Sequence, residues 1–297
     1  MMNSFDLNAY LSSKRRQINA ALDSLFVHTS RKLVKAMKHS LMAGGKRLRP
    51  ILCLAAAETV GGNSQDAIRA ACAIEMIHTY SLIHDDLPAM DDDELRRGQP
   101  TCHAIFDEAT AILAGDALLT MAFEVLSSMD SSEEGQAMDL IHVVHTLAGA
   151  AGYQGMIEGQ MQDIAAEGES LSLKELEKMH ALKTGALIEA SVTTGAILGK
   201  GTAFQMQQLK IYAKNIGLAF QVTDDILNIE GDPVIMGKHV GSDQIRLKST
   251  YPSVLGMDQS KQFAKKLVSN ALKALENFDT KAHSLRAIAN YIIDRKK

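Results

Sequence analysis

Two acidic clusters are the parts of this sequence best suited to chemistry. The first has six acidic side chains among the ten residues 85–94, directly after an apolar stretch, and the second is the pair Asp224–Asp225, which ends another apolar stretch. The C-terminal end of a helix already carries partial negative charge, so carboxylates gathered there repel it and one another. The pattern therefore predicts a compensating cation. Because the ligands on offer are all oxygens, we expect Mg²⁺.

An acidic run is most often a solvated surface, and either cluster alone would be interpreted in that way. Two Asp–Asp pairs, each at the end of an apolar helical stretch, favour a metal site instead.

Basic residues gather in the segment GGKRLRP, residues 44–50. Its two glycines let the backbone bend and approach a ligand, while Lys46, Arg47 and Arg49 offer charged donors that suit phosphate oxygens. The spacing is not that of a Walker loop. Further cations that could share a phosphate site are Arg96, Arg97, Lys183, Lys238 and Lys248. Each alone is typical of a surface, but together with the acidic clusters they predict a phosphate-rich, metal-bridged site.

The elements that must position these groups are helices. Apolar residues recur three and four positions apart through most of the chain, and Ser172 with Glu175 forms a capping-box pattern. The expected helices span residues 5–27, 30–43, 49–60, 64–87, 107–128, 133–151, 172–198, 203–228, 249–256, 259–277 and 281–294. Residues 230–246 contain three glycines and a proline and are expected to form a functional loop. We expect an all-α fold, a single-domain bundle of long helices over residues 1–297.

Composition excludes several classes of function. The chain of 297 residues is 46% hydrophobic and 22% charged, with only 5 prolines and 5% aromatic residues, which suits helices better than strands. Its net charge of −4 argues against a general nucleic-acid binder. No apolar run approaches the roughly 18 residues of a membrane span, and no secretory signal is visible. Three scattered cysteines fit a reducing environment, and we therefore expect a cytoplasmic location.

Several of these stretches resemble the trans-isoprenyl diphosphate synthases, and most closely the bacterial farnesyl diphosphate synthases. The matching segments are GGKRLRP (44–50), SLIHDDLPAMDDDELRRGQPTCH (81–103), KTGALI (183–188), FQVTDDIL (220–227), and GKHVGSDQ with KSTYP (237–252). They occur in the order found in the family and span most of the chain. One departure is Asn228, where the second motif of the family usually ends in Asp. An amide oxygen is a weaker metal ligand, so the resemblance implies looser binding of one metal.

The resemblance implies helices around a central active-site cavity in one polyprenyl synthetase domain, a homodimer, and Mg²⁺-dependent head-to-tail condensation of isopentenyl diphosphate with an allylic diphosphate. Three Mg²⁺ per active site are expected, held by Asp85, Asp86, Asp91, Asp224 and Asp225. The residues implied for the allylic diphosphate are Arg96, Lys183 and Lys238. Those implied for isopentenyl diphosphate are Lys46, Arg49, His78 and Arg97. Thr184 and Gln221 would face the forming carbocation. His78 could equally be a structural histidine.

The length of the product can be argued from helix geometry. Tyr80 precedes Asp85 by five residues on the same expected helix, which places it about 7.5 Å below the first cluster. Its ring could close the cavity or be an ordinary core aromatic. Family members with an aromatic residue here tend to make the C15 product, so the sequence favours farnesyl diphosphate. The alternatives are a geranylgeranyl diphosphate synthase, a terpene cyclase, and a non-catalytic synthase subunit.

Overall fold

A computed structural model describes residues 5–27, 29–129, 135–231 and 248–295. In this part of the chain the all-α fold expected from the sequence is confirmed. The helices are α1 (Leu7–Ser24), α2 (Lys32–Leu41), α3 (Leu48–Thr59), α4 (Ile68–Asp85), α5 (Cys102–Phe106), α6 (Glu108–Ser127), α7 (Gln136–Ala151), α8 (Met156–Ala165), α9 (Leu173–His180), α10 (Ala186–Leu198), α11 (Ala203–Glu230), α14 (Tyr251–Leu255), α15 (Met257–Ala274) and α16 (His283–Asp294). A π-helical turn (Ala181–Gly185) joins α9 to α10, and a short 3₁₀ turn (Thr280–Ala282) precedes α16.

Helix α4 lies at the centre of the bundle. Its side chains are apolar nearly all round, and a helix with that pattern is stable only when it is enclosed. It packs against α6, α3, α1, α2 and α10, and eleven of its eighteen residues are buried. The first acidic cluster therefore stands at the end of a helix that is largely enclosed by its neighbours.

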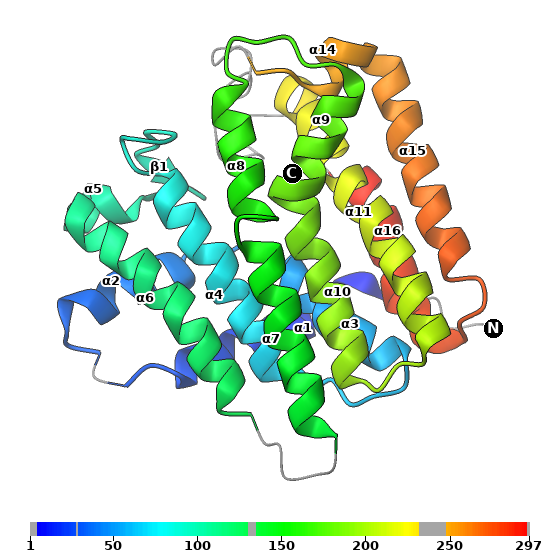
Figure 1. Ribbon diagram of the computed structural model, residues 1–297, viewed down its shortest axis with the longest axis horizontal. Helices are drawn as coiled ribbons and strands as arrows, with labels where there is room; N and C mark the ends of the chain where they lie inside the picture. The colour runs from blue at the N-terminus through cyan, green and yellow to red at the C-terminus, as the bar shows by residue number, and fades with distance from the viewer. Residues whose placement is uncertain (1–4, 28, 130–134, 232–247, 296–297) are drawn as a thin grey trace.

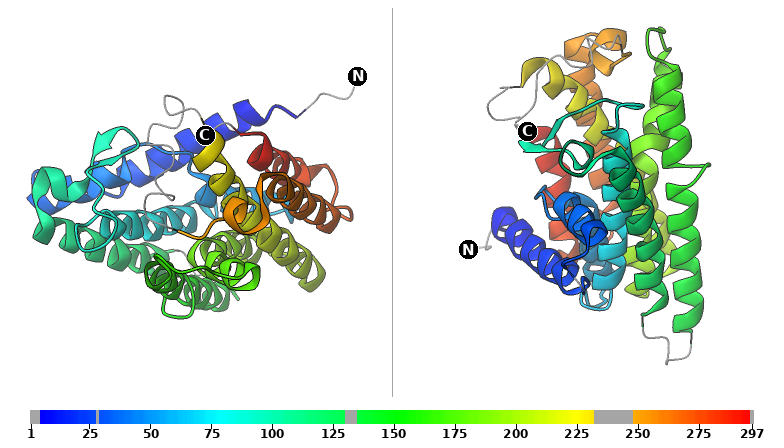
Figure 2. Two further views of the ribbon diagram at one scale, coloured as in Figure 1. Left: turned by 90° about the horizontal axis from the view of Figure 1, so that it is seen from above. Right: turned by 90° about the vertical axis from the view of Figure 1, so that its left-hand side faces the viewer.

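The remaining long helices surround α4. Figure 1 shows α6 to the left of α4, α7, α10 and α11 to its right, and α15 at the right-hand edge. The turned views of Figure 2 show α1 on the opposite side of the molecule from α7 and α8. Helices α3 and α10 fill the space between these layers because they pack against each other and against α4.

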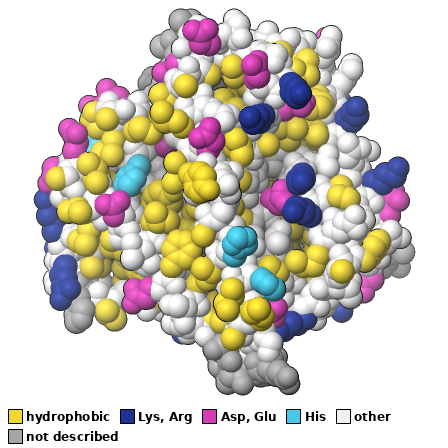
Figure 3. Space-filling view, in the orientation of Figure 1, with side chains coloured by type: hydrophobic (Ala, Val, Ile, Leu, Met, Phe, Trp, Pro, Cys, Tyr) yellow, Lys and Arg dark blue, Asp and Glu magenta, His cyan; other side chains and the backbone are white. Residues whose placement is uncertain are grey.

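One face of the bundle is apolar although it is exposed. It carries Ile112 and Leu113 of α6, Met138 and Ile141 of α7, and Met161 of α8, and Figure 3 shows apolar side chains spread over this side. Among the described helices, α6 alone is long and apolar enough to cross a membrane by length and composition. It also packs along α4, α2 and α5, as the core helices of many proteins do.

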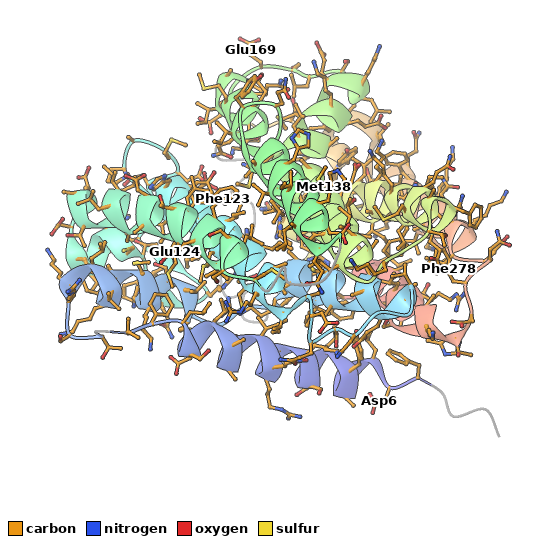
Figure 4. The ribbon with its side chains drawn as sticks, turned by 60° about the horizontal axis from the view of Figure 1, so that its bottom comes forward. Asp6, Phe123, Glu124, Met138, Glu169 and Phe278 are labelled. Atoms are coloured by element: carbon orange, nitrogen blue, oxygen red, sulfur yellow. The ribbon has the colours of Figure 1, made fainter. Side chains whose placement is uncertain are left out.

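The helix starts follow from capping chemistry. In Figure 4, α1 begins at Asp6, whose carboxylate accepts a hydrogen bond from the Ala9 N–H at 3.0 Å. The capping box of Ser172 with Glu175 is present as expected. Two differences concern the site. Helix α8 was not expected, and the helix expected over 172–198 contains the π-helical turn.

Candidate active site

The first acidic cluster forms where the chain folds back over the end of α4. Asp85 ends the helix and Asp86 caps it. The Asp91 N–H then donates to the Asp85 carbonyl at 2.8 Å, and the Asp93 N–H donates to the Asp86 carbonyl at 3.2 Å. Burial, with the charge of Asp91 added, raises the pKa of Asp85 to about 6, and burial also raises the pKa of Asp86 to about 7. The cluster thus crowds carboxyl groups that disfavour ionisation in the absence of a cation.

A two-stranded hairpin returns two arginines to this cluster. Strand β1 (Leu95–Arg96) pairs antiparallel with β2 (Gln99–Pro100). Arg97 and Gly98 between them have φ of 55° and 74°, as a type I′ turn requires. The Arg96 guanidinium thereby reaches the Asp86 carboxylate at 2.5 Å. Arg96 accordingly pairs with Asp86, and at 3.5 Å with Asp93, within the first cluster.

The glycine-rich loop lies beside the same hairpin. The Arg97 guanidinium donates to the Gly44 carbonyl, and Gly45 has a φ of 113°, a conformation that favours glycine. Arg49 approaches His78 at 3.4 Å. Burial, reinforced by the neighbouring arginines, holds the pKa of His78 well below its usual value, so its imidazole is neutral at neutral pH.

Arg47 does not belong to this group. Its guanidinium is buried, binds Glu75 at 2.6 Å and donates to the Leu41 carbonyl. The expectation that Arg47 reaches a phosphate is therefore wrong, because its guanidinium is buried in an ion pair with Glu75. Lys46 lies in the same loop between the glycines and Arg47 and is half-buried.

The π-helical turn carries Lys183 and Thr184. Two glycines let this turn approach the neighbouring helices closely. A Cβ on Gly159 of α8 would lie 2.1 Å from the backbone nitrogen of Lys183, and one on Gly217 of α11 would lie 3.0 Å from Gly185 Cα. One extra residue in a helical turn changes the directions of the side chains, and such turns are frequent at functional sites.

Asp163 of α8 binds two lysines at once. Its carboxylate accepts hydrogen bonds from Lys183 Nζ and from Lys248 Nζ, each at 2.7 Å. Burial alone would raise the pKa of Asp163, but the two lysines outweigh it and hold the pKa below its usual value. This pairing holds the ammonium of Lys183, a site residue that the sequence predicts. It also adds Asp163, a site residue that the sequence analysis did not predict.

The second acidic cluster is connected to the π-helical turn. Thr184 Oγ1 donates to Gln221 Oε1 at 3.1 Å, Gln221 Nε2 donates to Asp225 at 3.1 Å, and the Tyr251 N–H donates to the other Asp225 oxygen at 3.0 Å. This relay orients the Gln221 amide. Asp225 therefore has protein partners in addition to the metal that the sequence predicts for it.

Asp224 is paired with the end of the chain. Its carboxylate lies 2.8 Å from the Arg295 guanidinium, which also donates to the Phe220 carbonyl and stacks 4.1 Å from the centre of the Phe220 ring. Arg295 is another participant that the sequence analysis did not predict. Asn228 is buried one turn further along α11. Lys238 lies outside the described residues.

A cavity of about 510 Å³ joins these groups to apolar walls. Its polar end contains Asp85, Arg49 and Lys183. Its sides include Tyr80 and the α8 residues Met156, Ile157, Gln160, Met161 and Ile164. A smaller polar recess of about 90 Å³ shares Lys183 and also contains Asp163, Lys248 and Asp225. The structure thus brings Asp85 of the first cluster and Asp225 of the second to two adjoining spaces that share Lys183, with Arg49 in the larger and Lys248 in the smaller.

The donor chemistry fits magnesium that is completed by substrate. Among the described residues, no three His, Cys, Asp or Glu side chains form a ready-made metal cluster. Mg²⁺ does not need one, because it keeps several waters and binds through one or two carboxylates together with phosphates. The raised pKa values of Asp85 and Asp86 mark buried negative charge that a cation would stabilise.

Comparisons with known proteins agree on one family. Residues 30–291 match the model of the polyprenyl synthetase family. The chain is 48% identical, over 99% of its length and 81% of the relative, to the heterodimeric geranylgeranyl pyrophosphate synthase large subunit 1, chloroplastic, of Arabidopsis thaliana. It is 47% identical, over 98% of its length and 79% of the relative, to the chloroplastic geranylgeranyl pyrophosphate synthase of Capsicum annuum. The structure of geranylgeranyl pyrophosphate synthetase from Pyrococcus horikoshii matches with a TM-score of 0.86 at 32% identity, covering 97% of this chain and 98% of that one.

These findings correct the expected C15 product. The relatives are named for the C20 product, so the farnesyl expectation is contradicted and the geranylgeranyl alternative is favoured. The structure also shows that α4 is only one of the walls. Tyr80 lines one wall, whereas the lining on α8 runs from Ile164 to Met156, about 12 Å at the rise of a helix. The expectation of a floor about 7.5 Å below the first acidic cluster was based on α4 alone.

The expected cytoplasmic location is contradicted as well, because both plant relatives are named chloroplastic. The three cysteines are buried and free, which agrees with a reducing environment. A reducing environment is not unique to the cytoplasm, so free cysteines do not distinguish the cytoplasm from another reducing compartment.

Proposed function

The chain belongs to the polyprenyl synthetase family and is a prenyltransferase of isoprenoid biosynthesis, and on that premise we propose that it is a Mg²⁺-dependent geranylgeranyl diphosphate synthase. It would extend an allylic diphosphate with isopentenyl diphosphate until a C20 chain is reached. Residues 1–297 would form one catalytic domain.

One observation carries this proposal: the cavity of about 510 Å³ is lined by charged side chains, among them Asp85, Arg49 and Lys183, together with many apolar ones. A prenyl diphosphate has the same division between a charged head and a hydrocarbon chain. Lys183 belongs to both the cavity and the polar recess, so a chain in the cavity would have its diphosphate among the acidic clusters and the lysines. The product names of the relatives support the C20 length.

The diphosphate of the allylic substrate would be bound by metal ions and cations. Asp85, Asp86 and Asp91 would hold Mg²⁺ on one side, and Asp224 and Asp225 on the other, with three ions in the loaded site. Mg²⁺, when bound, would neutralise the diphosphate and make it a better leaving group. Arg96, Lys183 and Lys238 would donate to the same oxygens.

The second substrate would bind beside the glycine-rich loop. Lys46, Arg49 and Arg97 lie there or next to it, and charged donors of this kind suit the diphosphate of isopentenyl diphosphate. His78 would act as a neutral imidazole, since burial and the arginines hold its pKa low. A neutral imidazole can donate one hydrogen bond to a phosphate without adding charge.

The reaction would then follow from proximity and exclusion of water. The allylic C1–O bond breaks and its electron pair leaves with the diphosphate. The double bond of isopentenyl diphosphate supplies the pair for the new C–C bond, and the proton that is lost goes to the released diphosphate. Thr184 and Gln221, held by their mutual hydrogen bond, would present oxygens to the carbon that becomes positive. The apolar walls would keep water from quenching it.

We also infer that two copies of the chain pair through the apolar face. Leu113 of α6 is 58% exposed and Ile141 of α7 is 59% exposed, and a surface of this kind is typical of an interface. One relative is named as a subunit of a heterodimer, which favours pairing on this fold. The chloroplastic names of the relatives favour a plastid as the compartment.

Incubation with Mg²⁺, isopentenyl diphosphate and dimethylallyl diphosphate, followed by mass spectrometry of the products, tests the activity. A C20 diphosphate that disappears when the metal is chelated is expected. A C15 product would overturn the assigned chain length. The absence of product with any allylic starter would overturn the activity and leave a non-catalytic subunit. Light scattering of the purified chain, with a dimer expected and a monomer excluding the interface, tests the pairing.

A further inference from the structure

Arg47 and Glu75 form a buried ion pair to which the proposed chemistry gives no part. The Arg47 side chain is 0% exposed and that of Glu75 2% exposed, and their charged groups lie 2.6 Å apart. The Arg47 guanidinium also donates to the Asn19 side chain of α1 at 3.0 Å and to the Leu41 carbonyl at the end of α2 at 2.5 Å. The pair therefore ties α1, α2 and α4 to the residue that precedes α3.

Stability alone does not explain this arrangement. A buried ion pair loses the hydration of both charges, and well-packed apolar side chains of similar volume often stabilise a fold as well or better. Arg47 also has a backbone φ of 54°, in the left-handed region that residues other than glycine rarely adopt. Strained backbone of this kind persists where the surrounding structure enforces it, and it is concentrated at functional sites. The pair thus holds one particular backbone conformation at the start of α3.

That conformation sets a second contact beside the first. Arg49 lies in the first turn of α3, while Glu75 and His78 are three residues apart and share one face of α4. The segment therefore meets α4 twice, through Arg47 with Glu75 at 2.6 Å and through Arg49 with His78 at 3.4 Å. The second contact leaves a donor over, because the Arg49 Nε–H is inaccessible to solvent and has no hydrogen-bond partner among the described residues. Arg49 also lines the cavity, so a ligand there could accept that hydrogen bond.

Glu75 also supplies negative charge to a group of arginines. Burial lowers the pKa of Arg49 and that of Arg97, and in both cases the charge of Glu75 is the largest influence that opposes the change. A carboxylate among buried cations favours their charged forms, and charged guanidinium groups suit a diphosphate. Without the charge of Glu75, the arginines would repel one another and their arrangement would change.

We propose that Glu75 is a positioning residue for the second substrate, which acts through Arg47 to hold Arg49 where its remaining donor meets the diphosphate of isopentenyl diphosphate. The inference rests on the proposed function. Glu75 and Arg47 would not touch the substrate themselves, because both side chains are buried and face each other. A shift of about 1 Å in a group that binds substrate can cost on the order of 100-fold in rate. Loss of the pair should therefore weaken the binding of this substrate selectively.

The test compares Glu75→Gln with Glu58→Gln. Glu58 lies at the opposite end of α3 from Arg49 and accepts a hydrogen bond from Tyr10 of α1 at 2.7 Å, so the control also removes a charge that joins two helices. The Glu75→Gln change should raise KM for isopentenyl diphosphate by about 10–100-fold and leave KM for the allylic diphosphate within about threefold. The Glu58→Gln variant should keep both KM values, even if its Tm falls as far. Equal rises of both KM values in the Glu75→Gln variant, or no rise in either, would overturn the inference.

The double variant Arg47→Met/Glu75→Met separates position from stability. Its Tm should lie above that of Glu75→Gln, because the single change leaves the Arg47 charge buried and unpaired whereas the double change removes both charges. Calorimetry with Mg²⁺ and a non-reactive allylic thiolodiphosphate in place should nevertheless show isopentenyl diphosphate bound at least about 10-fold more weakly than by the wild type. Recovery of that affinity in step with the Tm would show a merely structural pair and overturn the inference. Failure of the wild type itself to bind isopentenyl diphosphate would instead overturn the proposed function on which the inference rests.

Discussion

Replacement of Asp163 by Asn tests how the lysines of the site are held. The change keeps the shape of the side chain and removes the negative charge that Lys183 and Lys248 share, each at 2.7 Å. Charge-assisted hydrogen bonds contribute about 1.5–3 kcal/mol each when buried. Lys183 remains 27% exposed and Lys248 15% exposed, which reduces both contributions. We expect a loss of about 2–3 kcal/mol in the free energy of unfolding, and hence a fall in Tm of about 4–8 °C.

Activity should fall further than stability alone would dictate. The ammonium of Lys183 is held by Asp163 at the mouth of the cavity, and misplacement of a binding group by about 1 Å can cost on the order of 100-fold in rate. We therefore expect kcat/KM to decrease by about that factor. Glu189→Gln is the matched control, because its ion pair with Lys210 is 3.4 Å long and its lysine is 58% exposed. That variant should lose no more than about 0.5 kcal/mol and keep its activity.

The pH dependence provides a second measurement of the same pairing. The pKa of Asp163 is lowered in the folded protein, so its contribution to stability is complete above the unfolded value of about 3.9 and is lost as the pH falls through the folded value. The difference in Tm between wild type and Asp163→Asn should therefore be largest near neutral pH and shrink below about pH 4. A Tm within 1 °C of wild type at neutral pH, with kcat/KM within threefold, would refute the argument.

Three further results are expected. Because burial raises the pKa of Asp85 to about 6 and that of Asp86 to about 7, the affinity for Mg²⁺ should fall as the pH drops from 8 to 5.5, with protons released on binding; calorimetry showing a flat profile would contradict this. The Tyr80→Ala change should leave the product length unchanged, since the ring lines one wall of the cavity, and an active variant with a longer product by mass spectrometry would show that Tyr80 controls length. Gly159→Ala places a Cβ 2.1 Å from the backbone nitrogen of Lys183. The free energy of unfolding measured in urea should therefore fall by about 1–3 kcal/mol, and kcat should also fall. Full retention of both quantities would show that α8 can move aside.

The sequence predicts the long helices well because their signal is local. Helix α4 is apolar nearly all round, and α9 begins with a capping box that is visible in the letters. Helix α8 was missed for an equally local reason. Glycines at 152, 155 and 159 weaken the helical pattern. The reason for glycine at 159, which is the close approach of the π-helical turn, can be seen only in the folded structure.

The assignment of charges is predicted less well, because neighbouring residues on a helix point in different directions. Arg47 precedes α3 with a left-handed φ of 54°, whereas Arg49 lies in the first turn of that helix. Arg47 is buried with Glu75, whereas Arg49 reaches His78 and the cavity. Within α11, the successive residues Asp224 and Asp225 also diverge: Asp224 pairs with Arg295, and Asp225 joins Gln221 and Tyr251. Spacing finds the cluster, but the partner of each charge depends on helices that are distant in sequence.

The length of the product is the clearest case of this limit. Counting residues from Asp85 to Tyr80 measures depth along α4, and α4 is only one wall. A cavity between helices closes where all its walls meet, and the opposite wall is α8, which the sequence did not predict. Its side chains Met156 and Ile157 line the cavity, yet Ile157 is also 50% exposed in the single chain. A wall that is half open to solvent cannot confine a hydrocarbon chain, because the chain would be wetted there. If the proposed pairing covers α8 with a second copy, the depth of the cavity becomes a property of the dimer, and no ruler along one helix can give it.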